Sequence, residues 1–183
     1  MNASSAFALL AVFASVIVPG ATNAQDNAAP AHTHNEFSFT AQGPYERVFP
    51  LFGALEEKKW AEGWEPQFVY PTPARDQRGM VFTTEHAGRT STWTCTAFDE
   101  STGYVQYVYV VSDFIVTMID IHLAKSGAAE THVSVVYQRT ALRAAANEDV
   151  AHLAKGDANS GPEWAEAING YLARVNKGEN VSK

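Results

Sequence analysis

The chain has 183 residues, 46% of them hydrophobic and 18% charged, which excludes a disordered or fibrous protein and favours one soluble globular domain. The net charge is −7, so the chain lacks the excess of basic residues on which nucleic-acid binding depends. The negative charge also opposes adsorption to an anionic membrane surface. The single cysteine, Cys95, excludes an internal disulfide framework and a metal site built from several cysteines.

Residues 1–24 predict a signal peptide. They carry no charged side chain, and residues 6–18 form a largely apolar stretch that is too short to span a bilayer. Pro19 and Gly20 end this stretch, and the small residues that follow fit cleavage after Ala24. No Lys or Arg precedes the stretch, so an uncleaved anchor or a misassigned start remains an alternative. We expect a secreted or periplasmic protein without stable membrane insertion after cleavage.

The next segment, residues 25–35, has no hydrophobic period and predicts a flexible lead-in. His32 and His34 within it could hold a metal ion transiently, but a closed site needs more ligands than stand nearby. We therefore expect solvated side chains and no metal. One folded domain is expected over residues 36–177, followed by a disordered tail at 178–183.

The domain begins with a strand and short helices. Residues 36–41 alternate apolar and polar side chains, which is typical of a strand. Helical spacing of apolar residues then predicts a helix that begins near Pro44. Because Pro50 removes a backbone donor and clashes with the preceding turn, we expect two short helical pieces.

The middle of the chain is rich in Val, Thr, Tyr and Phe, with turn residues at regular intervals. This pattern predicts an antiparallel meander, because the connections are too short for parallel crossovers. The expected strands are residues 67–72, 79–86, 89–98, 104–111, 114–123 and 131–140.

A helix is expected to close the domain from Pro162 onward. Its apolar stripe is formed by Trp164, Ile168, Tyr171, Leu172 and Val175. Ser160 and Glu163 stand at the spacing of a capping box. A shorter helical piece is expected at residues 149–155, and residues 156–161 separate it from the final helix. The stripe predicts that the final helix covers the sheet.

The register of the sheet can be predicted because cross-strand partners in a hairpin share a constant sum of residue numbers. The sums are about 175, 202 and 254 for hairpins that turn near residues 87, 101 and 127. The resulting inward pairs are Phe82 with Trp93, Met80 with Cys95, Thr84 with Ser91, Trp93 with Tyr109, Cys95 with Tyr107, Ala97 with Val105, Ile121 with Val133, Ile119 with Val135, and Thr117 with Tyr137.

The opposite, polar face then holds Asp120, His122, His132 and Ser134. The first three would cluster in space and could suggest a metal or acid–base site. We expect an ordinary surface instead, because no wall would exclude water there. A register slip of one residue would reverse this expectation.

Other candidates for chemistry are few. Cys95 lies in mid-strand on the apolar face, where a thiol is inert. Trp60 and Trp64 either close over a ligand or anchor a corner of the core. His86, at a hairpin end, is the best remaining acid–base candidate, although we expect it to be an ordinary turn residue. No phosphate-binding loop, nucleophile elbow, zincin helix or paired CxxC motif is present.

Several segments together resemble one superfamily. They are residues 47–52, the segment Trp60-Ala61-Glu62-Gly63-Trp64-Glu65-Pro66, the segment Thr92-Trp93-Thr94-Cys95, residues 104–111 and the helix 164–172. Over nearly all of residues 37–175 the chain resembles the SRPBCC, or START-like, superfamily of polyketide cyclase-like, helix-grip proteins. The resemblance implies an α+β helix-grip fold, an antiparallel sheet of about six to seven strands wrapped around a C-terminal helix, with a cavity between them. Members bind lipids, sterols or polyketides, and some catalyse cyclisation or dehydration.

We therefore expect an exported binding protein that holds a hydrophobic small molecule or lipid, without a cofactor. The predicted ligand-binding residues are Phe82, Trp93, Tyr107, Tyr109, Ile119, Tyr137, Trp164, Ile168 and Tyr171. An alternative is a cyclase- or dehydratase-like enzyme, which needs an inward titratable residue, and the predicted register offers none except His86 at the rim. A third is an interaction module with a filled core. The ligand's identity and the oligomeric state are left open.

Overall fold

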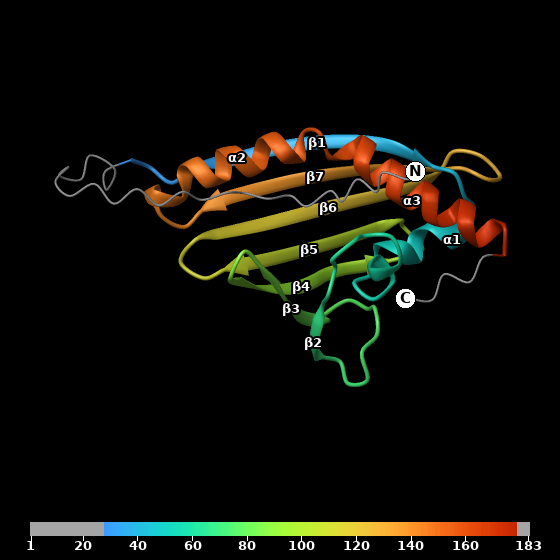
Figure 1. Cartoon of the computed structure of the whole chain (residues 1–183), viewed down its shortest axis with the longest axis horizontal. Helices are drawn as coiled ribbons and strands as arrows, with labels where there is room; N and C mark the ends of the chain where they lie inside the picture. The colour runs from blue at the N-terminus through green and yellow to red at the C-terminus, as the bar shows by residue number, and fades with distance from the viewer. Residues whose placement is uncertain (1–27, 179–183) are drawn as a thin grey trace, which may run out of the picture.

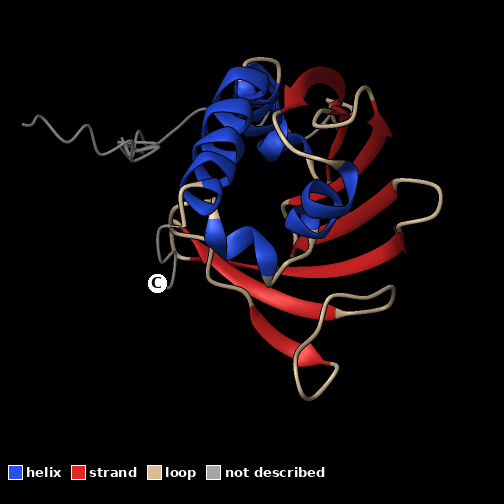
Figure 2. Ribbon diagram, turned by 90° about the vertical axis from the view of Figure 1, so that its right-hand side faces the viewer, coloured by secondary structure: helices blue, strands red, loops and turns tan. Residues whose placement is uncertain are grey.

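The computed structural model describes residues 28–178, and within them seven strands form one antiparallel sheet in the order β1-β7-β6-β5-β4-β3-β2 (Figure 1). The strands are β1 (His32–Ala41), β2 (Gln67–Tyr70), β3 (Val81–His86), β4 (Arg89–Asp99), β5 (Tyr104–Val111), β6 (Ile115–Lys125) and β7 (Thr131–Ala141). The sheet curves around the helices (Figure 2), so the predicted α+β helix-grip fold is confirmed. The predicted signal peptide and residues 179–183 lie outside the described residues.

The helices are α1 (Tyr45–Val48), α2 (Asn147–Asp157) and α3 (Ser160–Asn176), with 3₁₀ turns η2 (Phe49–Phe52), η3 (Glu56–Lys59) and η4 (Ala144–Ala146). Pro44 is the N-cap of α1, as expected. Pro50 lies in the first turn of η2, where the helix changes from α to 3₁₀ geometry because proline supplies no backbone donor. None of the helices described within residues 28–178 is long and apolar enough to cross a membrane.

Strand β1 begins at His32, four residues before the predicted start. The flexible lead-in predicted for residues 25–35 is therefore wrong for residues 32–35. The reason is long-range pairing: His32 lies opposite Thr140, and Asn35 lies opposite Tyr137 of β7. The His32 ring nitrogen Nδ1 is also 2.9 Å from Thr140 Oγ1. The composition of residues 32–35 does not indicate that they pair with β7.

The pairings predicted around residues 87 and 101 are confirmed as far as Cys95, which lies opposite Tyr107. A β-bulge then inserts one residue into β4, so Ala97 pairs with Gln106 and its predicted partner Val105 lies opposite Phe98. The bulge reverses the faces beyond it. Phe98, rather than Ala97, consequently packs against the hydrophobic core.

The hairpin between β6 and β7 turns one residue later than predicted. The turn is closed by a hydrogen bond of 3.1 Å from the backbone NH of Ser126 to the carbonyl of Glu130. The three pairs predicted there are wrong by two residues. The observed pairs are Ile119 with Tyr137, Ile121 with Val135, Leu123 with Val133, and Thr117 with Arg139. A shift of two residues keeps every side chain on its predicted face, since side chains alternate with a period of two.

The C-terminal helices are nearly continuous, because only two residues separate α2 from α3 rather than the six predicted. Both helices pack on the sheet, α2 against β1 and β7 and α3 against β1 (Figure 1). Ile168 and Leu172 of α3 are buried, as the predicted stripe requires. The predicted capping box is wrong, since the Ser160 hydroxyl donates to the Gly156 carbonyl at 3.0 Å instead.

A buried ion pair fastens the end of α2 to the sheet. Arg139 of β7 donates two hydrogen bonds of 2.6 Å to the Asp157 carboxylate, and each residue is only 6% exposed. The guanidinium also donates to Thr117 Oγ1 at 3.1 Å and to the Tyr109 hydroxyl, and it lies 4.8 Å from the Tyr137 ring centroid. Because both charges are buried, each needs the other.

We predict that Asp157→Ala lowers the free energy of unfolding by about 3–5 kcal/mol, because it leaves the Arg139 charge buried without its partner. Urea denaturation followed by circular dichroism measures this loss. Glu148→Ala, an exposed change in the same helix, is the control and should cost less than about 1 kcal/mol. A loss for Asp157→Ala no larger than that of the control would show that the pair does not hold the helix.

Candidate ligand-binding site

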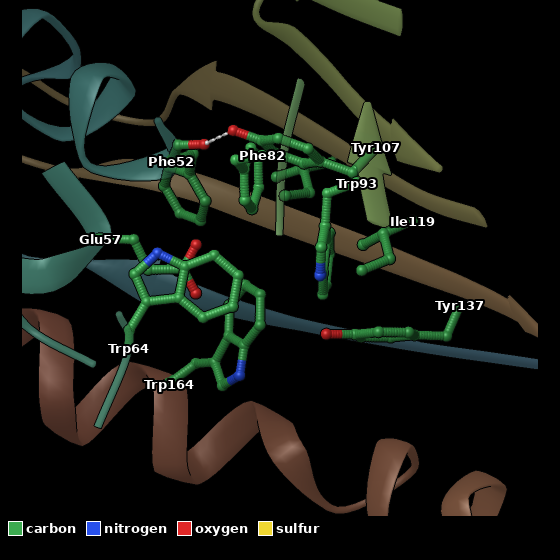
Figure 3. Close-up of a pocket in the computed structure, with 10 residues that line it drawn as sticks. Phe52, Glu57, Trp64, Phe82, Trp93, Tyr107, Ile119, Tyr137 and Trp164 are labelled. Carbon is green, nitrogen blue, oxygen red and sulfur yellow. Dashed lines mark hydrogen bonds between the residues drawn. The ribbon is translucent and has the colours of Figure 1, made fainter. Parts of the chain in front are cut away.

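A cavity of about 110 Å³ lies between the sheet, the 3₁₀ turns η2 and η3 and helix α3 (Figure 3). Its lining residues are Phe52, Glu57, Trp64, Phe82, Trp93, Tyr107, Ile119, Ile121, Tyr137 and Trp164. Seven of these ten are aromatic, and one is charged. We call this space the inner cavity.

Six of the nine predicted ligand-binding residues line the inner cavity, namely Phe82, Trp93, Tyr107, Ile119, Tyr137 and Trp164. The other three do not. Tyr109 lines a separate cleft, whereas Ile168 is fully buried in the core and Tyr171 packs against that core. Facing the sheet is therefore not sufficient for a helix residue to border the space.

Three of the aromatic side chains around the inner cavity are fixed by hydrogen bonds at their polar ends. Trp64 Nε1 donates to the Ala54 carbonyl at 2.8 Å, and Tyr107 OH donates to the Phe52 carbonyl at 2.9 Å. Trp93 Nε1 donates to a threonine hydroxyl of β3 at 2.9 Å. With these atoms satisfied, the faces of the rings are left as apolar walls.

Both tryptophans of the Trp-x-x-Gly-Trp segment anchor the loop after η3. Trp60 Nε1 donates to the Leu51 carbonyl at 2.7 Å, in the same way that Trp64 bonds to Ala54. The sequence left open whether Trp64 anchors a corner of the core or contacts a ligand. In the structure it anchors the corner and also lines the inner cavity. Trp60 packs against Trp164 with ring centroids 5.4 Å apart.

The acidic member of the inner cavity, Glu57, was not predicted from the sequence. It lies in the single 3₁₀ turn η3, and Figure 3 shows its carboxyl group beside the rings of Trp64 and Trp164. No side chain or backbone group within residues 28–178 donates a hydrogen bond to that carboxyl. Burial raises the pKa of Glu57 to about 8, and the nearby carboxylate of Asp76 adds to the shift. The group is therefore largely protonated at neutral pH.

A wider cleft of about 860 Å³ adjoins the inner cavity, and Trp64 and Trp93 line both spaces. We call it the outer cleft. It lies between α2, the loop after η3 and the ends of the β3–β4 and β5–β6 hairpins. Its lining residues are Ala61, Glu62, Gly63, Trp64, Glu65, Gln67, Thr84, Glu85, His86, Ala87, Arg89, Ser91, Trp93, Tyr109, Val111, Phe114, Ile115, Asp149, His152 and Leu153.

His86 is exposed and sits on the rim of the outer cleft, opposite Arg89 in the hairpin. A second histidine, His152 of α2, lines the same cleft. The structure thus places the predicted rim histidine beside the space, whereas the titratable group within the aromatic walls is Glu57.

The remaining candidates have structural explanations. Burial raises the pKa of the Cys95 thiol to about 12, and its Sγ lies 3.1 Å from the Ala97 carbonyl. On the outer face of the sheet, Asp120 accepts hydrogen bonds from Tyr104 and Gln106, and His122 and His132 are exposed. Within residues 28–178, no group of three or more metal-ligating side chains comes together.

Solved structures share this fold. Norcoclaurine synthase from Thalictrum flavum superposes with a TM-score of 0.57 at 8% identity, covering 90% of this chain and 98% of that one. The Zhui aromatase/cyclase from Streptomyces sp. R1128 gives 0.59 at 14% identity, covering 82% and 100%. Ara h 8.0201 gives 0.53 at 17% identity, covering 78% and 99%.

These neighbours are SRPBCC, or Bet v1-like, proteins, so the superfamily resemblance found in the sequence is confirmed at the level of the fold. The chain has the helix-grip fold of that superfamily. No sequence-family model matches the chain, and no curated protein is significantly similar to it in sequence. At these identities the superpositions establish architecture, and the side chains of the site must carry the functional argument.

We predict that Glu57 makes stability fall as the pH rises. Its pKa of about 8 in the folded chain exceeds the ordinary value of 4.5, so its contribution is complete below pH 4.5 and is lost as the pH rises through 8. Urea denaturation between pH 5 and 8.5 should give a wild-type slope steeper than that of Glu57→Gln, by at most about 1.4 kcal/mol per pH unit.

The matched control is Glu56→Gln on the same turn, whose carboxylate pairs with Lys59 away from the inner cavity. That variant should keep the wild-type slope. Parallel wild-type and Glu57→Gln curves would show that Glu57 ionises as it does in water.

Proposed function

We propose that this chain is an exported binding protein that holds a hydrophobic small molecule in the space between the sheet and the C-terminal helices. The observation that carries the proposal is the outer cleft. Its volume of about 860 Å³ falls in the range of about 300–1,000 Å³ typical of small-molecule sites. Trp93, Tyr109 and Val111 supply apolar surface, and polar groups are available at the rim to orient a guest.

The inner cavity supports the same proposal, because it extends the apolar surface beyond Trp64 and Trp93. Norcoclaurine synthase, which shares the fold, has been solved in complex with dopamine and hydroxybenzaldehyde, both small molecules. The export part of the proposal rests on residues 1–24, which carry no charged side chain and contain the largely apolar stretch 6–18.

Native mass spectrometry of the protein purified from its natural host tests both parts at once. We expect a mature chain that begins at Gln25 and carries an apolar adduct, which is released on denaturation. A compact chain without an adduct, which also takes up no hydrophobic dye, would contradict the binding function. Retention of residues 1–24 would contradict cleavage.

Matched variants locate the adduct. Ser91 is buried and faces the outer cleft, whereas its neighbour Thr92 is exposed on the opposite face of β4. Ser91→Phe should therefore place a ring in the cleft and reduce the level of the adduct, and Thr92→Phe should retain the adduct. Equal adduct levels in the two variants would place the guest elsewhere.

A second candidate function is acid–base catalysis of a cyclase or dehydratase kind, and Glu57 is the observation that favours it. A carboxyl group with a pKa of about 8 exchanges its proton near neutral pH, which suits a general acid or base. The sequence offered only the rim residue His86 for this role.

Exchange of the α-protons of cyclopentanone in deuterated water, followed by NMR, tests this second candidate. The Glu57 carboxylate would take the α-proton, leaving an enolate that recovers a deuteron. We expect the wild type to accelerate exchange and Glu57→Gln to lose about 10²–10⁴-fold of that rate. His86→Ala should retain it. Loss of exchange in His86→Ala alone would assign the role to the histidine.

A further inference from the structure

The inner cavity combines two features that an apolar guest does not explain. Its walls are mostly aromatic ring faces, and its one carboxyl group is that of Glu57. The carboxyl has no hydrogen-bond donor within residues 28–178, and no Lys, Arg or His lines the inner cavity. The chain thus places in this cavity a half-buried group that can become an anion, without supplying a cation for it.

We propose that the inner cavity is a site for a small organic ammonium ion, in which the Glu57 carboxylate is the counterion. This inference rests on the proposed binding function and names the chemical class of a guest or of one end of a guest. The rings of Trp64 and Trp164, which flank the carboxyl in Figure 3, offer the electron-rich faces that attract cations.

A second polar group faces the same space. The hydroxyl of Tyr137 points into the inner cavity in Figure 3, and no group within residues 28–178 hydrogen-bonds to it. A primary ammonium carries three donors and no acceptor, so a carboxylate and a hydroxyl oxygen are matching acceptors. A neutral apolar guest would leave both groups without a partner.

The proton balance follows from the groups that face Glu57. These are Asp76 from the loop before β3, Tyr107 from β5 and Tyr137 from β7, and none of them is a cation. Glu57 is therefore protonated at pH 7 when the inner cavity is empty. An ammonium ion that enters from water displaces this proton to the solvent, and the bound pair is RNH₃⁺ with the Glu57 carboxylate.

The size of the inner cavity limits the guest. An apolar cavity of about 150 Å³ accommodates benzene, so about 110 Å³ suits roughly five non-hydrogen atoms. Isobutylamine has this size, and isobutanol is an uncharged molecule of nearly the same shape. The two probes differ in charge and hydrogen-bonding capacity while burying similar apolar surface.

Titrations of the full chain with both probes, followed by tryptophan fluorescence and calorimetry, test the inference. At pH 9 isobutylamine should bind about tenfold or more tightly than isobutanol, because a charge-assisted hydrogen bond forms only with the amine. Amine binding should weaken about tenfold from pH 9 to pH 7, where about one proton is released per amine bound. Isobutanol binding should not change.

Glu57→Gln should remove the preference for the amine, the proton release and the pH dependence, while isobutanol still binds. Glu56→Gln, on the same turn but outside the inner cavity, should behave as the wild type. Should Glu57→Gln fail to fold, the proton count on the wild type decides alone, since release of no proton at pH 7 overturns the inference.

The outcomes separate this inference from the function on which it rests. Isobutanol binding without any preference for the amine would overturn the ammonium site and leave a hydrophobic binding protein. Binding of neither probe would overturn the ammonium site too, and the adduct detected by native mass spectrometry then decides independently whether the outer cleft holds a ligand.

Discussion

The position of the C-terminal helices depends on the buried pair between Arg139 and Asp157. This pair ties the last turn of α2 to β7 near the C-terminal end of that strand, so the helix stays above the curved sheet and forms one wall of the outer cleft. The same guanidinium bonds to Tyr109 and lies against Tyr137, one residue lining each space. The buried Arg139 side chain thereby connects helix α2 to one lining residue of the inner cavity and to one of the outer cleft.

The inner cavity shows how a packed core can keep a reactive group. The polar atoms of Trp64 and Tyr107 are bonded to backbone carbonyls, so these two rings cannot easily turn to pair with the Glu57 carboxyl group. Glu57 is left to adjust by holding its proton rather than by pairing. This arrangement costs folding free energy at higher pH, and natural proteins tolerate such costs mainly where they serve a function.

Much of the fold follows from alternation and turn residues. These patterns placed Phe82, Trp93 and Tyr107 on the inner face, because side-chain period and hairpin sums are local properties. The bulge after Cys95 and the ion pair of Arg139 with Asp157 were not predictable, since each depends on partners distant in the chain. Glu57 escaped notice because a single 3₁₀ turn of two Glu and two Lys has the composition of a solvated surface and no period that separates its faces.

The contact between Trp64 and Trp93, which line both spaces, affects how fast a guest can move between them. Their ring centroids are 5.4 Å apart in edge-to-face contact, which leaves no gap for an atom to pass between them. A guest that passes between these two rings therefore requires one indole to rotate aside, both when it enters and when it leaves. The residence time of such a guest would then depend on how fast the hydrogen-bonded indole rotates, and not only on the affinity of the inner cavity for the guest.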